Sequence, residues 1–542
     1  MNVETQLKGS HRSRLLKSAS IVSAMTLLSR IGGLVREMLM AHFFGTSVLK
    51  SAFDIAFLIP NLFRRLFGEG ALTGAFVPVF SRELADNGVE RANQLAMRVI
   101  GLLIVVLGAI VALGIGVTFV LPVMLPAESA WLLPLPMARI LLPYAVLICV
   151  AALIAGMLNS IGKFAVSSFA PFLLNLVWII AMLIIGVVAV SEQSAQLRLL
   201  CYVILGAGLL QIAVQIPVLL KAGFVFKPVF KGLFADAGIV KILRLMGPAA
   251  LGAGILQVNV CVDKLLAYWA GSYGPAALVY AERLIYLPLG IFGAAFMTVL
   301  LPTFSRHASN NQSHLIGSDL MDSLVNLTLV MLPCACGLMA LARPLMEIVY
   351  GGGESAFDAR SAVLSARALI AYAPGLLVFS YNKALIPAFY GMQDIKTPTK
   401  VSLGVLILNI ILNIVCVLMF PDGWKHAGIA VSTVVCSVVS LIVLYLILRR
   451  QIGAVSEERR VLSVLLRTAV AAVLMGFAVS LAYTHLMSVL PSGGIWHTVV
   501  VITVVLIGVV LYGGLLAVLC SRELADLLLV LKKRIGRKNS GN

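Results

Sequence analysis

Runs of about 20 apolar residues recur along this chain from residue 19 to residue 519, and no long hydrophilic block separates them. An α-helix of this length crosses the roughly 30 Å of hydrocarbon in a bilayer. Since 61% of the 542 residues are hydrophobic and 12% are charged, the polar surface is too small to cover a soluble globule of this size. The pattern predicts an all-α polytopic membrane protein with no room for a separate catalytic domain.

Fourteen candidate spans are centred near residues 31, 66, 111, 149, 179, 209, 254, 291, 334, 376, 408, 438, 474 and 507. An even number places both termini on one side of the membrane. The odd-to-even connections, such as residues 46–50, 271–275, 351–360 and 421–425, are short and poor in basic residues, whereas the opposite connections and the closing KKRIGRK are basic. By the positive-inside rule, both termini are expected in the cytoplasm.

The net charge of +18 is therefore interpreted as the result of basic residues gathered on the cytoplasmic side of the membrane. A second interpretation is that these residues contact anionic membrane lipids. No nucleic-acid partner is expected. The N-terminal MNVETQLKGSHRSRLLKSAS resembles a signal peptide. Because the apolar stretch after it carries Arg30 and Arg36 and leads into more membrane, we expect a retained first span. The eight cysteines lie in apolar runs or at their ends and are interpreted as small apolar residues, not disulfides or metal ligands.

An internal echo divides the chain. VPVFSR ends the second span and LPTFSR ends the eighth. The residues that recur, at a displacement of six spans, are Pro78, Phe80, Ser81 and Arg82, which correspond to Pro302, Phe304, Ser305 and Arg306. A weaker echo joins LLPYAVL at 141 to LIAYAPGL at 369. Two parallel six-helix halves are the economical interpretation. The predicted parts are a tail at 1–18, an N-lobe at 19–225, a C-lobe at 226–452, two further spans at 453–525 and a basic tail at 526–542.

Ionisable residues inside spans are costly, so they are expected to face a cavity or each other. Most of them lie in the first two spans of each half, and the full set is Arg30, Arg36, Glu37, Asp54, Arg64, Arg65, Glu69, Arg244, Asp263, Lys264, Glu282, Arg283 and Lys383. Arg65 and Glu69 have the i,i+4 spacing of an ion pair on one helical face.

The remaining arginines have no such carboxylate. Asp54 lies ten residues before Arg64, and adjacent helical residues, such as Arg36 and Glu37, point about 100° apart. We therefore expect a cationic surplus, and planar guanidinium groups suit phosphate or carboxylate. Helix breakers such as Pro60 and Pro288 lie close by, and irregular backbone at membrane depth is tolerated where it lines a wet cavity. The alternative is that these arginines snorkel or hold helices together.

A second cluster is acidic and amide-rich. Asp263 lies in span 7, Asn409 and Asn413 share one face of span 11, and Thr433 lies in span 12. Their oxygens suit a hard cation such as Na⁺, a candidate coupling ion, although interhelical hydrogen bonding is the alternative. No enzyme is expected, because GGGES at 351 lacks the Lys and Ser/Thr of a phosphate loop and neither HExxH nor GxSxG occurs.

Several long motifs carry a family resemblance: SRIGGLVRE at 29, PNLFRRLFGEGALTGAFVPVF at 60, YAERLIYLPLGIFGAAFMTVLLP at 280, ALIPAFYGMQDIKTP at 384 and KHAGIAVST at 425. The chain resembles the MurJ (MviN) family of flippases for lipid II, the undecaprenyl-diphosphate-linked peptidoglycan precursor. That family belongs to the multidrug/oligosaccharidyl-lipid/polysaccharide exporter superfamily. The resemblance, from about residue 18 to residue 520, implies a fourteen-helix bacterial inner-membrane protein with two lobes around a cationic cavity and a lipid-tail groove on the last two helices.

Position by position, the resemblance implies that Arg30, Arg36, Arg64 and Arg283 are cavity arginines that bind substrate and that Glu69 belongs to the same cavity. It also implies a sodium site at Asp263, Asn409, Asn413 and Thr433. Two positions depart from the family pattern, because Ser51 stands where some members have Asp and Leu58 where they have Lys. Asp54, one turn after Ser51, is a candidate replacement for the first, and nothing evident replaces the second.

The function expected from these observations is translocation of lipid II to the outer leaflet by alternating access, with membrane lipids and cell-wall synthesis enzymes as further partners. One alternative is a related multidrug/sodium antiporter or polysaccharide-repeat flippase, but a cavity for cationic drugs should be acidic and this one is basic. Another is a non-transporting scaffold for cell-wall assembly, for which the intramembrane arginines would be dispensable.

Overall fold

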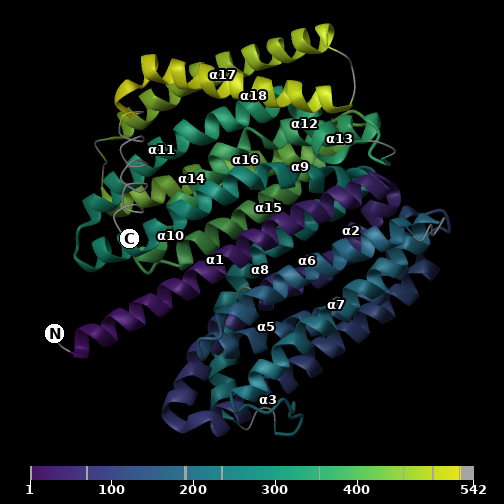
Figure 1. Cartoon of the computed structure of the whole chain (residues 1–542), viewed down its shortest axis with the longest axis vertical. Helices are drawn as coiled ribbons and strands as arrows, with labels where there is room; N and C mark the ends of the chain where they lie inside the picture. The colour runs from purple at the N-terminus through teal and green to yellow at the C-terminus, as the bar shows by residue number, and fades with distance from the viewer. Residues whose placement is uncertain are drawn as a thin grey trace. The chain divides into compact units, whose positions relative to one another are not determined.

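The computed structural model describes residues 3–68, 71–187, 192–232, 236–352, 355–453, 455, 457–490, 494–523 and 525. Every regular element in these ranges is helical (Figure 1). The all-α fold class predicted from the apolar runs is therefore confirmed for the described part of the chain.

The chain divides into two compact units, residues 1–265 and residues 266–542. The first unit holds α1 (Val3–Phe44), α2 (Val48–Phe63), η1 (Arg64–Gly68), α3 (Ala71–Met124), η2 (Ala130–Leu132), α4 (Pro134–Leu141), α5 (Tyr144–Ser160), α6 (Phe164–Val187), α7 (Gln193–Lys221) and most of α8 (Ala237–Ala270). The second holds α9 (Gly274–Pro288), η3 (Leu289–Gly293), α10 (Ala294–Ser309), α11 (Ser313–Ala340), α12 (Ala342–Tyr350), α13 (Ala359–Tyr372), α14 (Gly375–Gly391), α15 (Lys396–Met419), α16 (Lys425–Ile452), α17 (Glu458–Val489) and α18 (Gly494–Leu519).

Nine helical stretches among the described residues are long and apolar enough to cross a membrane. The number rises to eleven if two bent pairs, Ala130–Leu141 with Tyr144–Ser160 and Ala359–Tyr372 with Gly375–Gly391, each count as one span. Val48–Met124 is a single stretch of 77 residues, and Gly88 interrupts it with φ 78° and ψ −176°, a conformation that favours glycine. A polytopic membrane protein is thus confirmed, whereas the count of fourteen spans stays a prediction.

Helix irregularities occur at matching places in the two units. The π-helical turn η1 begins four residues after Pro60, and the π-helical turn η3 begins directly after Pro288. The bends of 42° and 47° fall at the two echoing motifs LLPYAVL and LIAYAPGL. Proline removes a donor from the helical ladder and its ring crowds the preceding turn, which explains why the chain widens or bends there. The irregular backbone predicted beside Arg64 and Arg283 is present.

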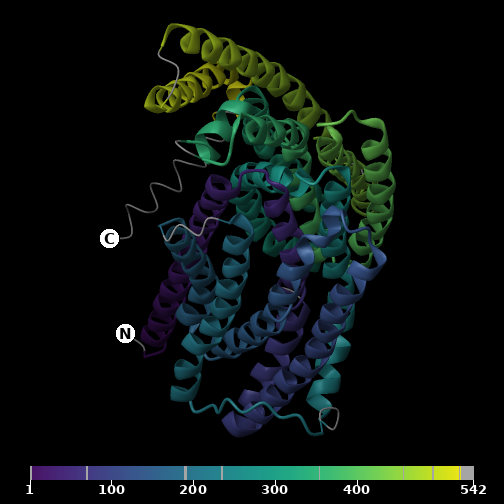
Figure 2. The same ribbon diagram turned by 90° about the vertical axis from the view of Figure 1, so that its right-hand side faces the viewer.

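The last two helices, α17 and α18, lie side by side at the yellow end of the chain (Figures 1 and 2). They are joined to α11, where Tyr512 donates a hydrogen bond from its hydroxyl to the carbonyl of Leu329 at 2.7 Å. Their outer faces are apolar and open, with Phe477 70% exposed and Val510 75% exposed. Apolar side chains left uncovered on this scale are expected where lipid is the solvent.

The segment that follows α7 is tied to α3 within the first unit. Phe224 is buried against Phe80, and the backbone N–H of Val229 donates to the carbonyl of Met97 at 3.1 Å. Gly101 makes this approach possible, because a Cβ there would lie 2.0 Å from the carbonyl oxygen of Val229. This close contact holds the connection between the predicted lobes along the side of α3.

Candidate functional site

Arg64 stands at the start of η1, at the point where the second predicted span loses regular helical geometry. Its side chain is half-buried, and Nε donates to Oδ1 of Asn61 one turn earlier at 3.1 Å. Pro60 precedes this pair and cannot donate a backbone hydrogen bond. The local sequence Pro-Asn-Leu-Phe-Arg therefore produces both the irregular helix and an oriented guanidinium group at membrane depth.

Arg65, the next residue, is also half-buried. Glu69, its predicted ion-pair partner and a predicted cavity residue, lies outside the described residues, so the pairing stays a prediction.

Arg30 lies on α1 with an exposed side chain. Its neighbour Ser29 accepts a hydrogen bond at its carbonyl oxygen from Nδ2 of Asn175 in α6, at 3.0 Å. The same Asn175 accepts at Oδ1 from Nη1 of Arg36 at 3.1 Å. Gly32 lets α6 come this close, since a Cβ there would lie 3.3 Å from Cβ of Asn175. Asn175 thus fixes the register of α1 against α6 through two contacts, one with Ser29 beside Arg30 and one with Arg36.

Arg36, Glu37, Lys50 and Asp54 form a buried charge cluster between α1 and α2. Nη2 of Arg36 lies 2.7 Å from Oε1 of Glu37, and Oε2 of Glu37 lies 3.9 Å from Nζ of Lys50. Nζ of Lys50 donates to both carboxylate oxygens of Asp54 at 2.7 Å. The Arg36 guanidinium also stacks 4.4 Å from the ring centre of Trp178. The cluster combines two positive and two negative charges and is formally neutral.

Two expectations are wrong here. Arg36 was expected to have no neutralising partner because Glu37 is adjacent, but the long guanidinium side chain folds back and reaches it. Residues 46–50 were expected to form a connection, yet α2 begins at Val48 and the side chain of Lys50 is 1% exposed. The i,i+4 spacing of Lys50 and Asp54 was the available signal. Lys50 is the residue directly before Ser51, one of the two departures from the family pattern, and both Ser51 and Leu58 are buried.

In the second unit, Arg283 is half-buried on α9 beside Glu282. The hydroxyl of Tyr372 donates to Oε1 of Glu282 at 3.3 Å. Lys383 of α14 lies against η3, with its Cδ 3.2 Å from the position that a Cβ of Gly293 would take. The π-helical turn of this half therefore has a cationic side chain packed beside it, from a different helix than in the first half.

The candidate sodium ligands fall into two groups. Asn409 and Asn413 are buried, and Nδ2 of Asn413 donates to Oδ1 of Asn409 at 2.9 Å, as their shared face predicts. Ser432, which the sequence did not single out, contacts Asn409, because Nδ2 of Asn409 lies 3.4 Å from its Oγ. Oγ1 of Thr433 donates to the carbonyl of Ile429 at 3.0 Å.

Asp263 is buried in α8 within the first unit and accepts a hydrogen bond at Oδ2 from Nδ2 of Asn259 at 3.3 Å. Asn259 is a second polar residue that the sequence reasoning missed, although its i,i+4 spacing from Asp263 is visible. Each unit therefore contains an amide side chain that pairs with another oxygen-bearing side chain one helical turn away.

Comparison with known proteins adds family information. The family model described as lipid II flippase MurJ matches residues 40–511. A probable lipid II flippase MurJ of Vibrio cholerae serotype O1 is 33% identical over 444 residues, which cover 80% of this chain and 82% of that protein. The lipid II flippase MurJ of Burkholderia cenocepacia is 34% identical over 445 residues, covering 81% of this chain and 84% of that one.

Among solved structures, a lipid II flippase MurJ in an inward closed conformation superposes with a TM-score of 0.73 at 23% identity. The match covers 92% of this chain and 98% of that one. At this identity the likeness concerns the fold, and it extends over nearly the whole described helical arrangement.

Proposed function

Since this chain belongs to the MurJ family of lipid II flippases, we propose that it carries lipid II from the cytoplasmic to the outer leaflet by alternating access, with a cationic cavity that binds the diphosphate. This is transport without a chemical reaction. The bilayer is the bacterial inner membrane, and undecaprenyl-linked precursor, membrane lipids and cell-wall synthesis enzymes are the partners that we propose.

One observation carries the proposal. From residue 30 onward, α1, α2 and η1 contain more basic than acidic residues. The basic residues are Arg30, Arg36, Lys50, Arg64 and Arg65, and the acidic residues are Glu37 and Asp54. Glu37 and Asp54 are held by Arg36 and Lys50 in the buried charge cluster. The formal charge of these seven residues is therefore +3, or +2 if Glu69 is counted. Such a surplus is costly in hydrocarbon and becomes favourable when an anion enters.

We propose that Arg30 and Arg64 bind the diphosphate directly, joined by Arg283 from the other half. Each charge-assisted hydrogen bond contributes roughly 1.5–3 kcal/mol, so several contacts offset part of the desolvation of a diphosphate. Arg65 and Glu69 are proposed as cavity residues. Arg36, which is stacked on Trp178, and Asp54 are proposed to shape the wall of the cavity rather than to touch the substrate.

We further propose fourteen spans with both termini in the cytoplasm. Gly88 divides the 77-residue stretch into two spans, and each bent pair counts as one. Added to these are α1 and α8. The corresponding parts are the lobes 19–225 and 226–452, followed by residues 453–525, whose exposed apolar faces suit a groove for the lipid tail.

The release step requires a driving force. The membrane potential supplies about 2.3 kcal/mol per charge per 100 mV, and a potential that is negative inside favours outward movement of an anion. We propose Na⁺ as the ion that resets the carrier, bound by Asp263, Asn409, Asn413 and Thr433. Support comes from the burial of Asn409 and Asn413 in a membrane helix. Translocation that is indifferent to Na⁺ and to Asp263→Ala would contradict this coupling.

Complementation of a flippase-depleted strain tests the cavity. Arg30→Ala, Arg64→Ala and Arg283→Ala are expected to fail to rescue growth at normal expression, whereas Arg82→Ala is expected to rescue it. Arg82 is a suitable control because its side chain is 73% exposed in a predicted cytoplasmic segment. If all three cavity variants rescue growth like the control, the diphosphate-binding mechanism is wrong and a scaffold role is favoured.

A further inference from the structure

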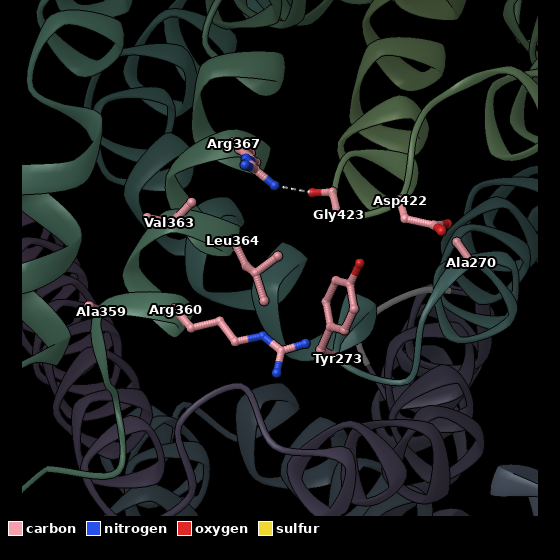
Figure 3. A pocket seen from close by; sticks show the side chains of 9 residues that line it. All are labelled: Ala270, Tyr273, Ala359, Arg360, Val363, Leu364, Arg367, Asp422 and Gly423. Carbon is pink, nitrogen blue, oxygen red and sulfur yellow. Dashed lines mark hydrogen bonds between the residues drawn. The ribbon is translucent and has the colours of Figure 1, made fainter.

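A cavity of about 630 Å³ lies in the second unit, and none of the arginines discussed above lines it (Figure 3). Three connections of the chain meet there: the turn between α8 and α9, the start of α13, and the turn between α15 and α16. Its lining residues are Ala270, Tyr273, Ala359, Arg360, Val363, Leu364, Arg367, Asp422 and Gly423, here called the outer pocket.

Local sequence explains how the outer pocket forms. Arg360, Leu364 and Arg367 follow one another at the spacing that places side chains on one face of a helix. Gly423 turns the opposite wall with φ 81°, and a Cβ at this position would lie 2.7 Å from Nη1 of Arg367. Glycine is therefore required for the wall to approach the arginine.

Arg367 is held rigidly. Its Nη1 donates to the carbonyl of Gly423 at 2.8 Å, and its guanidinium carbon lies 4.9 Å from the ring centre of Trp424. Below it, the buried His426 shares a hydrogen bond between Nε2 and the carbonyl of Leu364 at 2.9 Å, and the ring of Tyr273 packs edge-on against His426 at 5.4 Å. The floor of the pocket is thus pre-organised before any ligand arrives.

Arg360 provides the charge. Its side chain is exposed, and Figure 3 shows its guanidinium extending toward Tyr273. Asp422 is 93% exposed and pairs with Lys425 at 2.7 Å, while Oδ1 of Asp358 caps α13 by accepting from the backbone N–H of Ser361 at 2.8 Å. Within the described part of the chain, Arg360 has no hydrogen-bond partner, although its charge interacts with the carboxylate of Asp358. Arg360, Arg367 and Lys425 outnumber the two carboxylates by one positive charge.

We propose that the outer pocket binds the carboxylate of a peptide, with Arg360 and Arg367 as the charged ligands. This proposal rests on the proposed function in one respect, the side of the membrane on which the pocket lies. In the proposed topology of fourteen spans with cytoplasmic termini, all three connections join an odd span to the next even span and therefore face the outside of the cell. Guanidinium groups match carboxylate geometry, and the volume lies within the usual range of small-ligand sites. The apolar floor of Val363 and Leu364 suits short aliphatic side chains.

The peptide has two potential sources, the stem of a translocated lipid II molecule or the stems of polymerised peptidoglycan. Calorimetric titration of the purified full chain tests the binding with a soluble stem peptide that has a free C-terminal carboxylate, and with the same peptide as its carboxamide. We expect the acid to bind at least about tenfold more tightly than the amide, and Arg360→Gln to lower affinity for the acid by about tenfold or more.

Arg343→Gln is the matched control, because Arg343 is an arginine of the same unit, 59% exposed, that does not line the pocket. It should bind like the unmodified chain. Equal affinity for acid and amide, or unchanged binding by Arg360→Gln, would overturn the proposal. Competition by lipid II assigns the first source, competition by soluble glycan strands assigns the second, and competition by neither also overturns it.

The same preparations are titrated with lipid II. An Arg360→Gln variant that keeps lipid II binding and loses peptide binding supports a pocket distinct from the cavity. If the unmodified chain binds the peptide but no lipid II, the proposed function fails while the peptide site stands.

Discussion

Lys50 offers the sharpest test of how the first unit is held together. Its side chain is 1% exposed, Nζ lies 2.7 Å from both oxygens of Asp54, and Glu37 lies 3.9 Å away. Lys50→Met keeps the length of the side chain and removes the charge, so Asp54 is left as a buried carboxylate without its main counter-charge. Removing one partner of a buried ion pair costs roughly 3–5 kcal/mol.

The assay is thermal unfolding of the purified chain in detergent, followed by its intrinsic tryptophan fluorescence. A dye that reacts with thiols is avoided because the chain has eight free cysteines. Lys50→Met is expected to lower the midpoint clearly, and Lys50→Met with Asp54→Leu is expected to recover most of the loss, since both charges are then gone. Lys163→Met, at an exposed position, should change stability by less than about 0.5 kcal/mol. If Lys50→Met unfolds at the same temperature as this control, the buried charge cluster is not a structural element.

Gly101→Ala places a Cβ 2.0 Å from the carbonyl oxygen of Val229, so the segment after α7 should detach from α3. Limited trypsin digestion should then cleave this segment faster. Gly108→Ala is the control and should not change the digestion, because a Cβ there has no atom within 4 Å. Asp358→Ala should destabilise α13 by about 1 kcal/mol at neutral pH through loss of its cap. The hydrogen bond from the backbone of Ser361 lowers the pKa of Asp358, so the stabilisation is complete above the unfolded pKa near 3.9 and is lost as pH falls through the lower folded pKa. The difference in unfolding midpoint between the variant and the unmodified chain should therefore shrink below about pH 4, and a difference that grows there would contradict the capping account.

The sequence predicted those features that depend on local chemistry. The length of the apolar runs determines the all-α class, and the prolines at 60 and 288 indicate where the two π-helical turns arise. The i,i+4 spacing of Asn409 and Asn413 predicts their shared face, and the hydrogen bond between them agrees.

Features that depend on long side chains or distant segments could not be predicted in the same way. Hydropathy alone assigns Lys50 to a connection, since a lysine lowers the hydropathy of its surroundings. Its burial in a helix depends on ion pairs with Asp54 and with Glu37 of the neighbouring helix, which hydropathy does not contain. Adjacent residues on a helix point about 100° apart, which argues against an ion pair between Arg36 and Glu37. The side chain of Arg36 is long and flexible enough to reach Glu37 all the same. The contact of Ser432 with Asn409 requires the packing of α15 on α16, which no single-helix pattern contains.

Direct binding of lipid II to the purified chain, compared with undecaprenyl diphosphate alone, tests the central claim that arginines in the first unit hold the diphosphate. The account predicts that Arg64→Gln weakens binding of both ligands by about tenfold or more, because both carry the diphosphate, while Arg82→Gln leaves both affinities unchanged. Equal affinity of Arg64→Gln, Arg30→Gln and the unmodified chain for lipid II would contradict it.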